Sequence, residues 1–309
     1  MPSPDILERL SAGEVLILDG GTGSELQRRG VNVDKGSTTG VLGVWSASAN
    51  LDAPRVVREI HEDYLKAGAD IVTSNNFYTS KEMLAMIGEE GRWEEYTRRG
   101  GELAIQARNA AKPEAYVAGG FAPPYSGDLR EVFGNQSRVL AQVGVDFMMP
   151  EYMGGDSLIE SPLADCVAAV DACQNTGLPV FIGICKVQEN GRMFNGESFS
   201  DLAAALKGHR VDGIFLMCSY PKAISACLPK LREAFDGTIG AYAHLGYDSN
   251  PKFGTSLDEP FFTIDWEGYT PERYAQCALE WKEMGAQVIG GCCGTGPEHI
   301  AAVRSVLKV

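Results

Sequence analysis

Short apolar runs alternate with amphipathic stretches of helical length along the chain, and this alternation repeats eight times. Each run stays apolar at consecutive positions, which is typical of strands buried on both faces of a parallel sheet. The stretches between them carry a helical periodicity, as at 54–68, 160–177 and 270–286, where Thr270 is the expected N-cap before Pro271. The expected strands are 15–21, 69–75, 115–123, 145–153, 179–186, 211–219, 238–244 and 286–294.

Eight β-α units in 309 residues predict an α/β fold, a single (β/α)8 TIM barrel domain spanning residues 1–309. The main alternative is a doubly wound open sheet, because VLILDGGTGSELQRRG at 15–30 resembles a glycine-rich nucleotide loop. Such a sheet usually has fewer strands and a second domain, and no linker or composition break marks one. The active site is expected at the C-terminal face of the strands, because the long connections all follow strands. These connections are 23–53, 123–135, 187–199 and 245–269.

The charge balance excludes several classes of partner. A net charge of −14 and a pI near 4.8 argue against a nucleic-acid surface and against attraction to anionic membranes. The first residues lack the pattern of a secretory signal, and no apolar run approaches the length of a membrane span. We therefore expect a cytoplasmic protein whose eight cysteines are reduced. The oligomeric state does not follow from the sequence.

Chemically useful side chains end most of the expected strands, as a barrel with its site at the strand ends requires. Three of them are cysteines, and barrel curvature would bring them together in the arrangement of a catalytic zinc site with one position open. Gly290, Gly291 and Gly294 would let the backbone leave β geometry, so that adjacent cysteines can face one ion. These strand-end residues are Asp19, Asn75, Asn76, Glu151, Cys218, His244, Cys292 and Cys293.

The residues alone leave other interpretations of the cysteines open. Cys218 could be a buried small hydrophobe, and the pair Cys292 and Cys293 could form a vicinal disulfide or a redox switch. The remaining five cysteines are expected to be structural, since most of them lie in amphipathic helices and one lies near a strand end. These five are Cys166, Cys173, Cys185, Cys227 and Cys277.

Three segments together resemble the zinc-dependent homocysteine S-methyltransferase family. They are ILDGGTGSELQRRG, LGVWSASANLDAPRVVREIHEDYLKAGADIVTSNNFYTS and QVIGGCCGTGPEHIAAV, and the similarity extends from Leu16 to Val303. The resemblance implies a barrel fold, zinc bound by Cys218, Cys292 and Cys293, and homocysteine as a substrate. It also implies that the amino-acid substrate contacts Asp19, Gly20, Gly21 and Glu151.

The methyl donor is expected to carry an activated methyl group on a sulfonium or ammonium centre, because zinc makes the homocysteine sulfur a thiolate nucleophile. Aromatic faces bind such cations, and the candidates are Trp45, Phe77, Tyr78 and Tyr152. Trp45 is favoured because VWS matches a family position in the loop after the first strand. One departure from the family pattern lies beside the metal ligands, where Met217 replaces a common asparagine.

The sequence thus predicts a zinc-dependent S-methyltransferase that moves a methyl group from a cationic donor to homocysteine and produces methionine. Carboxylates at Asp19 and Glu151 would pair with the homocysteine ammonium group, and backbone N–H groups near Gly20 and Gly21 would bind its carboxylate. Two alternatives remain: a methyltransferase of the same fold acting on another thiol, and a non-catalytic zinc- or redox-sensing barrel.

Overall fold

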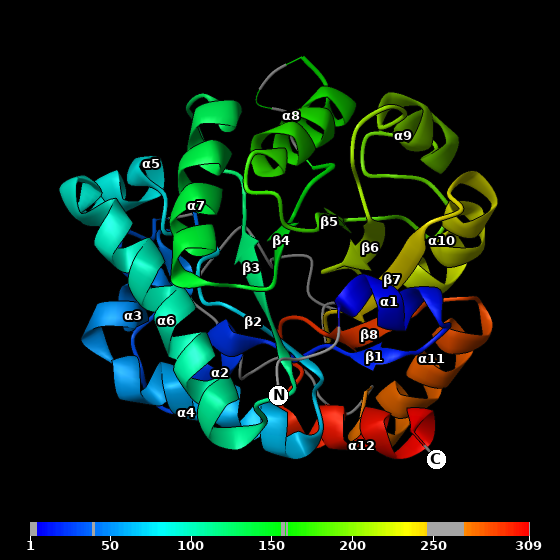
Figure 1. Cartoon of the computed structure of the whole chain (residues 1–309), viewed down its shortest axis with the longest axis horizontal. Helices are drawn as coiled ribbons and strands as arrows, with labels where there is room; N and C mark the ends of the chain where they lie inside the picture. Colours follow the sequence, from blue (N-terminus) through cyan, green and yellow to red (C-terminus); the bar gives the residue numbers. More distant parts are fainter. Residues whose placement is uncertain (1–4, 39–40, 156–157, 159, 246–268, 309) are drawn as a thin grey trace.

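Eight strands follow one another in the part of the chain that the computed structural model describes, and helices surround them (Figure 1). The structure describes residues 5–38, 41–155, 158, 160–245 and 269–308. Each strand lies inside one of the expected apolar runs, so the eightfold alternation in the sequence is confirmed. The strands are β1 Leu16–Ile17, β2 Ile71–Thr73, β3 Tyr116–Phe121, β4 Phe147–Pro150, β5 Phe181–Cys185, β6 Gly213–Met217, β7 Thr238–Ala243 and β8 Val288–Gly291.

Helices occupy the connections between the strands and form an outer layer around them (Figure 1). Short 3-10 turns lie at Trp45–Ser48 (η1), Ala85–Ile87 (η2) and Glu90–Arg92 (η3). The α-helices are α1 Ile6–Ser11, α2 Thr22–Arg28, α3 Ala49–Asp52, α4 Pro54–Ala67, α5 Lys81–Leu84, α6 Trp93–Ala111, α7 Leu129–Val143, α8 Pro162–Gln174, α9 Phe199–Ala205, α10 Pro221–Ala234, α11 Pro271–Glu283 and α12 Pro297–Leu307.

All ladders between the described strands are parallel, and they form two sheets. One sheet has the order β1-β8-β7-β6-β5, and the other has the order β2-β3-β4. Isolated parallel bridges join the sheets, from Leu18 to Ile71 on one side and from Met148 to Val180 on the other. The first strand therefore lies beside the last one, which is not the order of a dinucleotide-binding sheet. The fold is an α/β fold of the TIM-barrel type.

The strands are buried on both faces, as their continuous apolar character predicts. Alternate residues face an inner cluster, which includes Leu16, Phe147, Phe181, Phe215 and Tyr242. The four aromatic rings among them contact one another in series from β4 to β7, with centroid separations of 5.0 Å, 5.2 Å and 6.4 Å. The residues between them, such as those at 182, 214 and 239, pack against the helices. This alternation directs every second side chain at the strand ends toward the interior.

Helix α1 covers the amino-terminal ends of the strands. Its residues Ile6 and Leu10 belong to the inner cluster, and the Gln287 side chain just before β8 donates a hydrogen bond of 2.6 Å to the Leu10 carbonyl. The opposite, carboxyl ends of the strands are left for a binding site. No helix in the described ranges combines the length and the apolar character that a membrane span needs.

Helix α11 begins where the sequence predicts, whereas α7 begins earlier than expected. Thr270 caps α11 by accepting a hydrogen bond from the Arg273 amide at 3.3 Å, and Pro271 is its first residue, as predicted. The expected connection 123–135 is shorter than predicted, because Asp128 caps α7 and the helix begins at Leu129. The connection 23–53 contains α2, η1 and α3, whereas most of 245–269 lies outside the described residues.

Candidate active site

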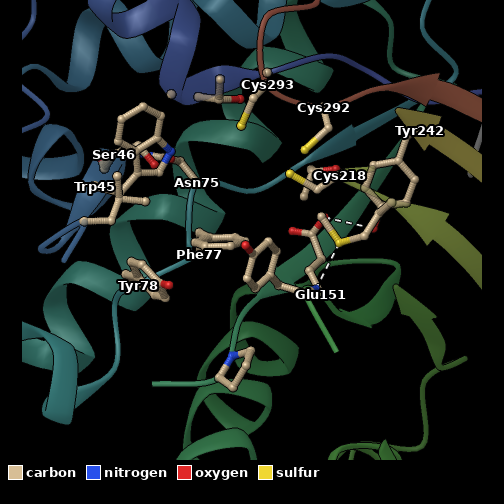
Figure 2. Close-up of a pocket in the computed structure, with 18 of the residues that line it drawn as sticks. Trp45, Ser46, Asn75, Phe77, Tyr78, Glu151, Cys218, Tyr242, Cys292 and Cys293 are labelled. Carbon is tan, nitrogen blue, oxygen red and sulfur yellow. Dashed lines mark hydrogen bonds between the residues drawn. The ribbon is translucent and has the colours of Figure 1, made fainter. Parts of the chain in front are cut away.

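A cavity of about 520 Å³ lies at the carboxyl ends of the strands, where a barrel-type fold positions its site. All eight described strands, or the segments that follow them, contribute residues to its wall, and Figure 2 shows several of these residues. The wall includes all eleven residues predicted for substrate or metal binding, which are Asp19, Gly20, Gly21, Trp45, Phe77, Tyr78, Glu151, Tyr152, Cys218, Cys292 and Cys293.

Three cysteine sulfurs meet at one end of this cavity (Figure 2). The Sγ atoms of Cys218, Cys292 and Cys293 all lie within 4.8 Å of one another. Cys218 follows β6 with a φ of 40°, and its amide donates to the Tyr242 carbonyl at 3.1 Å. Cys292 and Cys293 follow β8 in a turn, and the Thr295 hydroxyl donates to the Cys292 carbonyl at 2.6 Å. The backbone leaves β geometry there, which is how two adjacent side chains reach one point.

The three thiols form an electron-rich cluster with the chemistry of a site for a soft metal ion. Hydrogen bonds from Cys218 and Cys292 hold the pKa of Cys293 well below its usual range, so one thiolate forms readily in the cluster. Among the abundant divalent ions, zinc is the one that binds thiolate sulfur well. Three protein ligands would leave its fourth position for a substrate atom. The cluster could therefore hold a metal ion, with its open side toward the cavity.

The two glycines after β1 allow the cysteine turn to approach. A Cβ atom on Gly21 would lie 2.6 Å from the Cys292 carbonyl oxygen and 2.5 Å from Ser24 Oγ. One on Gly20 would lie 2.7 Å from the Thr295 carbonyl oxygen. The Gly21 amide already donates to that same carbonyl at 3.1 Å, so it does not serve a substrate carboxylate in this conformation. Close packing against the cysteine turn therefore requires glycine at both positions of the DGG segment.

Asp19 begins the same segment, and its carboxylate is buried at the wall of the cavity. The Thr73 amide donates to Asp19 Oδ2 at 2.8 Å, and the Thr73 hydroxyl donates to Oδ1 at 3.1 Å. Burial raises the pKa of Asp19 to about 8, although both hydrogen bonds from Thr73 oppose that change. A bound cation would lower this pKa and stabilise the negatively charged carboxylate.

Glu151 is the second buried acid of the cavity, and it follows β4. The Tyr242 hydroxyl donates to Glu151 Oε1 at 3.0 Å (Figure 2). Burial raises the pKa of Glu151 well above its usual range, and the nearby Cys292 and Asp19 raise it further. Two acids that are desolvated and close to thiols form a site that favours a positively charged group.

Aromatic rings form another part of the wall (Figure 2). The Phe77 ring lies 4.6 Å from the Tyr78 ring and 5.7 Å from the Tyr152 ring, measured between centroids. Trp45 lies over Gly23, where a Cβ atom would overlap the indole ring. The Asn75 side chain donates to the Ser46 carbonyl at 2.9 Å, which fixes the chain next to the tryptophan. The four predicted aromatic residues therefore face the same cavity.

Some strand-end residues do not reach the cavity. The Asn76 side chain donates to the Thr97 carbonyl at 2.8 Å and lies between helices. His244 packs its ring 4.9 Å from the Tyr220 ring, and burial lowers its pKa to about 3. Cys185 is buried in the inner cluster, as expected for a structural cysteine. The other structural cysteines are buried or half-buried away from the three-cysteine cluster, namely Cys166, Cys173, Cys227 and Cys277.

Three residues at the site were missed by the sequence analysis. Thr73 supports Asp19, Tyr242 supports Glu151, and Lys186 follows β5 at the cavity wall. The alternation of side chains in strands could have indicated Tyr242, because it lies four positions after Thr238 on a predicted strand. Pairing of Asp19 with Thr73 joins residues 54 positions apart, and nothing in the sequence specifies it.

Comparisons with known proteins agree with this geometry. The model of the family described as homocysteine S-methyltransferase matches residues 16–307. The betaine–homocysteine S-methyltransferase 1 of Bos taurus is 29% identical over 98% of this chain and 74% of its own. The S-methylmethionine–homocysteine S-methyltransferase BHMT2 of Rattus norvegicus is 28% identical over 98% of this chain and 81% of its own.

Solved structures show the same fold. The homocysteine methyltransferase MmuM from Escherichia coli, in its metallated form, superposes with a TM-score of 0.76 and 22% sequence identity, covering 98% of this chain and 99% of its own. Its oxidized form superposes with a TM-score of 0.73. Because the family match covers nearly the whole chain, the protein belongs to the homocysteine S-methyltransferase family.

Proposed function

We propose that the protein transfers a methyl group from a cationic sulfonium or ammonium donor to homocysteine, producing methionine, with zinc bound by Cys218, Cys292 and Cys293. The observation that carries this proposal is the meeting of three thiols with two buried acids and an aromatic wall in one cavity. Membership of the homocysteine S-methyltransferase family supports the same reaction.

The cysteine cluster fits zinc by its donor atoms and by their spacing. The three sulfurs lie within 4.8 Å of one another and face a cavity large enough for an amino acid and a small donor. Zinc bound there would lower the pKa of the homocysteine thiol and supply its thiolate form as the nucleophile. The three ligands must stay reduced, which agrees with the expected cytoplasmic location.

The two buried acids are suited to the ammonium group of homocysteine. Asp19 and Glu151 are desolvated, and the pKa of each is raised, so a bound ammonium group would stabilise their charged forms. Thr73 and Tyr242 hold the two carboxylates in place through hydrogen bonds of 2.8 Å and 3.0 Å. Homocysteine would then be oriented with its amino-acid end at the acids and its sulfur at the cysteine cluster.

The aromatic wall is suited to the methyl donor. Ring faces attract a cationic centre without supplying a nucleophile that would compete for the methyl group. In the reaction the homocysteine sulfur forms a bond to the methyl carbon while the bond from that carbon to the donor nitrogen or sulfur breaks. The electron pair stays with the donor, which leaves as a neutral amine or thioether. The residues of the wall are Trp45, Phe77, Tyr78 and Tyr152.

We also infer that the strands close into one (β/α)8 barrel domain that spans residues 1–309. This inference is supported by the isolated parallel bridges that connect the edges of the two sheets, from β1 to β2 and from β4 to β5. The inner aromatic series and the cover provided by α1 agree with a filled barrel interior.

A donor and acceptor panel tests the proposed function. Purified protein loaded with zinc would be incubated with trimethylglycine, S-methylmethionine or S-adenosylmethionine, and with homocysteine or cysteine as the acceptor. We expect methionine from homocysteine with at least one donor, and loss of that activity with a chelator. Transfer to cysteine in preference to homocysteine would refute the acceptor assignment. Reversible oxidation of Cys292 and Cys293 without turnover would instead support a redox-sensing barrel.

Cys218→Ala separates the two outcomes within the protein itself. It removes one sulfur of the cluster and leaves the adjacent pair unchanged. We expect it to abolish methyl transfer, whereas a switch based on Cys292 and Cys293 alone would survive. Cys277→Ala is the matched control, since Cys277 is half-buried on α11 and lies outside the cluster.

A further inference from the structure

A pair of buried asparagines joins two segments that contribute aromatic residues to the cavity wall. Asn50 lies on α3, which follows β1, and Asn75 lies after β2. The Asn50 side chain donates from Nδ2 to the Asn75 carbonyl at 2.8 Å, and the Asn75 side chain donates from Nδ2 to Asn50 Oδ1 at 2.9 Å. The two residues therefore bind each other reciprocally, although they are 25 positions apart in the sequence.

The second N–H group of each side-chain amide extends the pair in a different direction. Asn75 Nδ2 also donates to the Ser46 carbonyl at 2.9 Å, next to Trp45 (Figure 2). Asn50 Nδ2 also donates to the Tyr96 carbonyl at 3.1 Å, on α6. Turning the Asn50 amide over would place its oxygen against two carbonyl oxygens, so only one orientation fits. The pair thus connects the segment that carries the tryptophan to a helix of 19 residues.

Helix α6 packs tightly against this pair. A Cβ atom on Gly100, four residues after Tyr96, would lie 2.8 Å from Asn50 Nδ2. Asn50 is 0% exposed, so water cannot replace a hydrogen bond that is lost there. A substitution at Asn50 would therefore leave Asn75 without a fixed partner, while the outer surface of the protein would stay unchanged.

Trp45 depends on such support, because its backbone has a φ of 47°. This left-handed conformation is unfavourable for a residue with a Cβ atom, and it persists only where neighbouring contacts maintain it. The Asn75 side chain binds the residue directly after Trp45, and the indole packs over Gly23. Asn50 in turn fixes the orientation of the Asn75 amide. Asn50 therefore acts on the position of the indole through one intermediate residue.

We propose that Asn50 is a positioning residue for methyl transfer, which fixes Trp45 in the cavity wall through Asn75 and anchors both to α6. This inference rests on the proposed function, in which Trp45 contacts the methyl donor. Asn50 itself contacts neither substrate and holds no proton in the reaction. Its loss should therefore weaken donor binding and leave the homocysteine site and the cysteine cluster unchanged.

Steady-state kinetics of Asn50→Leu, with the most active donor of the panel, test the proposal. The substitution preserves volume and removes all three hydrogen bonds of the side chain. We expect the KM for the donor to rise about fivefold or more, which corresponds to the loss of about one hydrogen bond. The KM for homocysteine and the zinc content should stay within twofold of wild type. Asn50→Ser keeps a hydroxyl and is the milder variant if Asn50→Leu does not fold; it should raise the donor KM by a smaller factor.

Thr97→Val is the matched control. Thr97 is buried on the same helix, directly after Tyr96, and its hydroxyl donates to Thr79 Oγ1 at 3.0 Å. The substitution removes a buried hydrogen bond of α6 that does not involve the asparagine pair. We expect both KM values to stay within twofold of wild type. A rise in the donor KM equal to that of Asn50→Leu would overturn the proposal, because any loosening of α6 would then suffice.

A double-mutant cycle tests whether Asn50 acts through the tryptophan. In a Trp45→Ala background, Asn50→Leu should change the donor KM by less than twofold, because the ring that it positions is gone. The same factor in both backgrounds would overturn the proposal. So would an unchanged donor KM in folded Asn50→Leu protein.

A measurement without turnover separates this inference from the proposed function. The indole N–H resonance of Trp45 would be assigned in zinc-loaded protein by its absence from Trp45→Phe. We expect Asn50→Leu or Asn50→Ser to shift this resonance, whereas Thr97→Val should leave it in place. If the wild-type protein transfers no methyl group from any donor, the proposed function fails, and the indole resonance still tests the asparagine pair. An unshifted resonance in folded Asn50 variants would refute the positioning role.

Discussion

Tyr242→Phe removes one hydroxyl group and tests whether Glu151 acts as a charged partner of homocysteine. The hydroxyl donates to Glu151 Oε1 at 3.0 Å, and both residues are buried. Burial raises the pKa of Glu151, and this hydrogen bond opposes that change by stabilising the carboxylate. A hydrogen bond to a charged group contributes about 1.5 to 3 kcal/mol. If binding requires the carboxylate, its loss corresponds to a roughly 10- to 150-fold weaker interaction with homocysteine.

The assay is steady-state methyl transfer at saturating donor, with the zinc content of each sample measured in parallel. We expect the KM for homocysteine to rise at least tenfold, while the zinc content and the KM for the donor stay close to wild-type values. Tyr116→Phe is the matched control, because Tyr116 begins β3 at the opposite end of the strands. A change in the KM for homocysteine of less than threefold, in protein that retains its zinc, would refute the assigned role of Glu151.

Three further substitutions test separate parts of the structure. Gly23→Ala would place a methyl group against the Trp45 indole, so we expect a tenfold or greater rise in the donor KM with unchanged zinc content; normal donor kinetics would contradict it. Gly134→Ala adds a methyl group in open space within α7 and should raise the free energy of unfolding in urea by about 0.5 to 1 kcal/mol, rather than lower it. Burial lowers the pKa of His61 from 6.5 to about 4, so this histidine takes up a proton at a higher pH in the unfolded chain than in the folded one. The free energy of unfolding therefore falls as the pH drops from 6.5 toward 4. Relative to His61→Leu, wild type should lose about 2 kcal/mol between pH 7 and pH 5; parallel pH profiles would rule this out.

The order of strands and helices could be predicted because it depends on local patterns. Continuous apolar runs specify strands buried on both faces, and Thr270 with Pro271 specifies a helix start. Asp128 carries a signal of the same kind, and reading it as an N-cap would have placed the start of α7 correctly. The expected connection 123–135 instead placed that start seven residues too late.

The supporting residues of the site could not be predicted, because they depend on contacts between distant strands. Asp19 was visible as a strand-end acid, but its partner Thr73 is specified only when β1 and β2 lie side by side. Likewise, the glycines of the DGG segment resembled a nucleotide loop until the cysteine turn was found against them. Lys186 gave no signal at all, since its conformation is a property of the folded backbone.

The central claim is that one zinc ion, held by Cys218, Cys292 and Cys293, is required for methyl transfer to homocysteine. The most direct measurement is a chelator titration in which zinc per chain and methionine formation are determined on the same samples. We predict about one zinc per chain at the start, activity that falls in proportion to the zinc removed, and recovery when one equivalent of zinc is restored. Full activity in protein from which the zinc has been removed would contradict the claim.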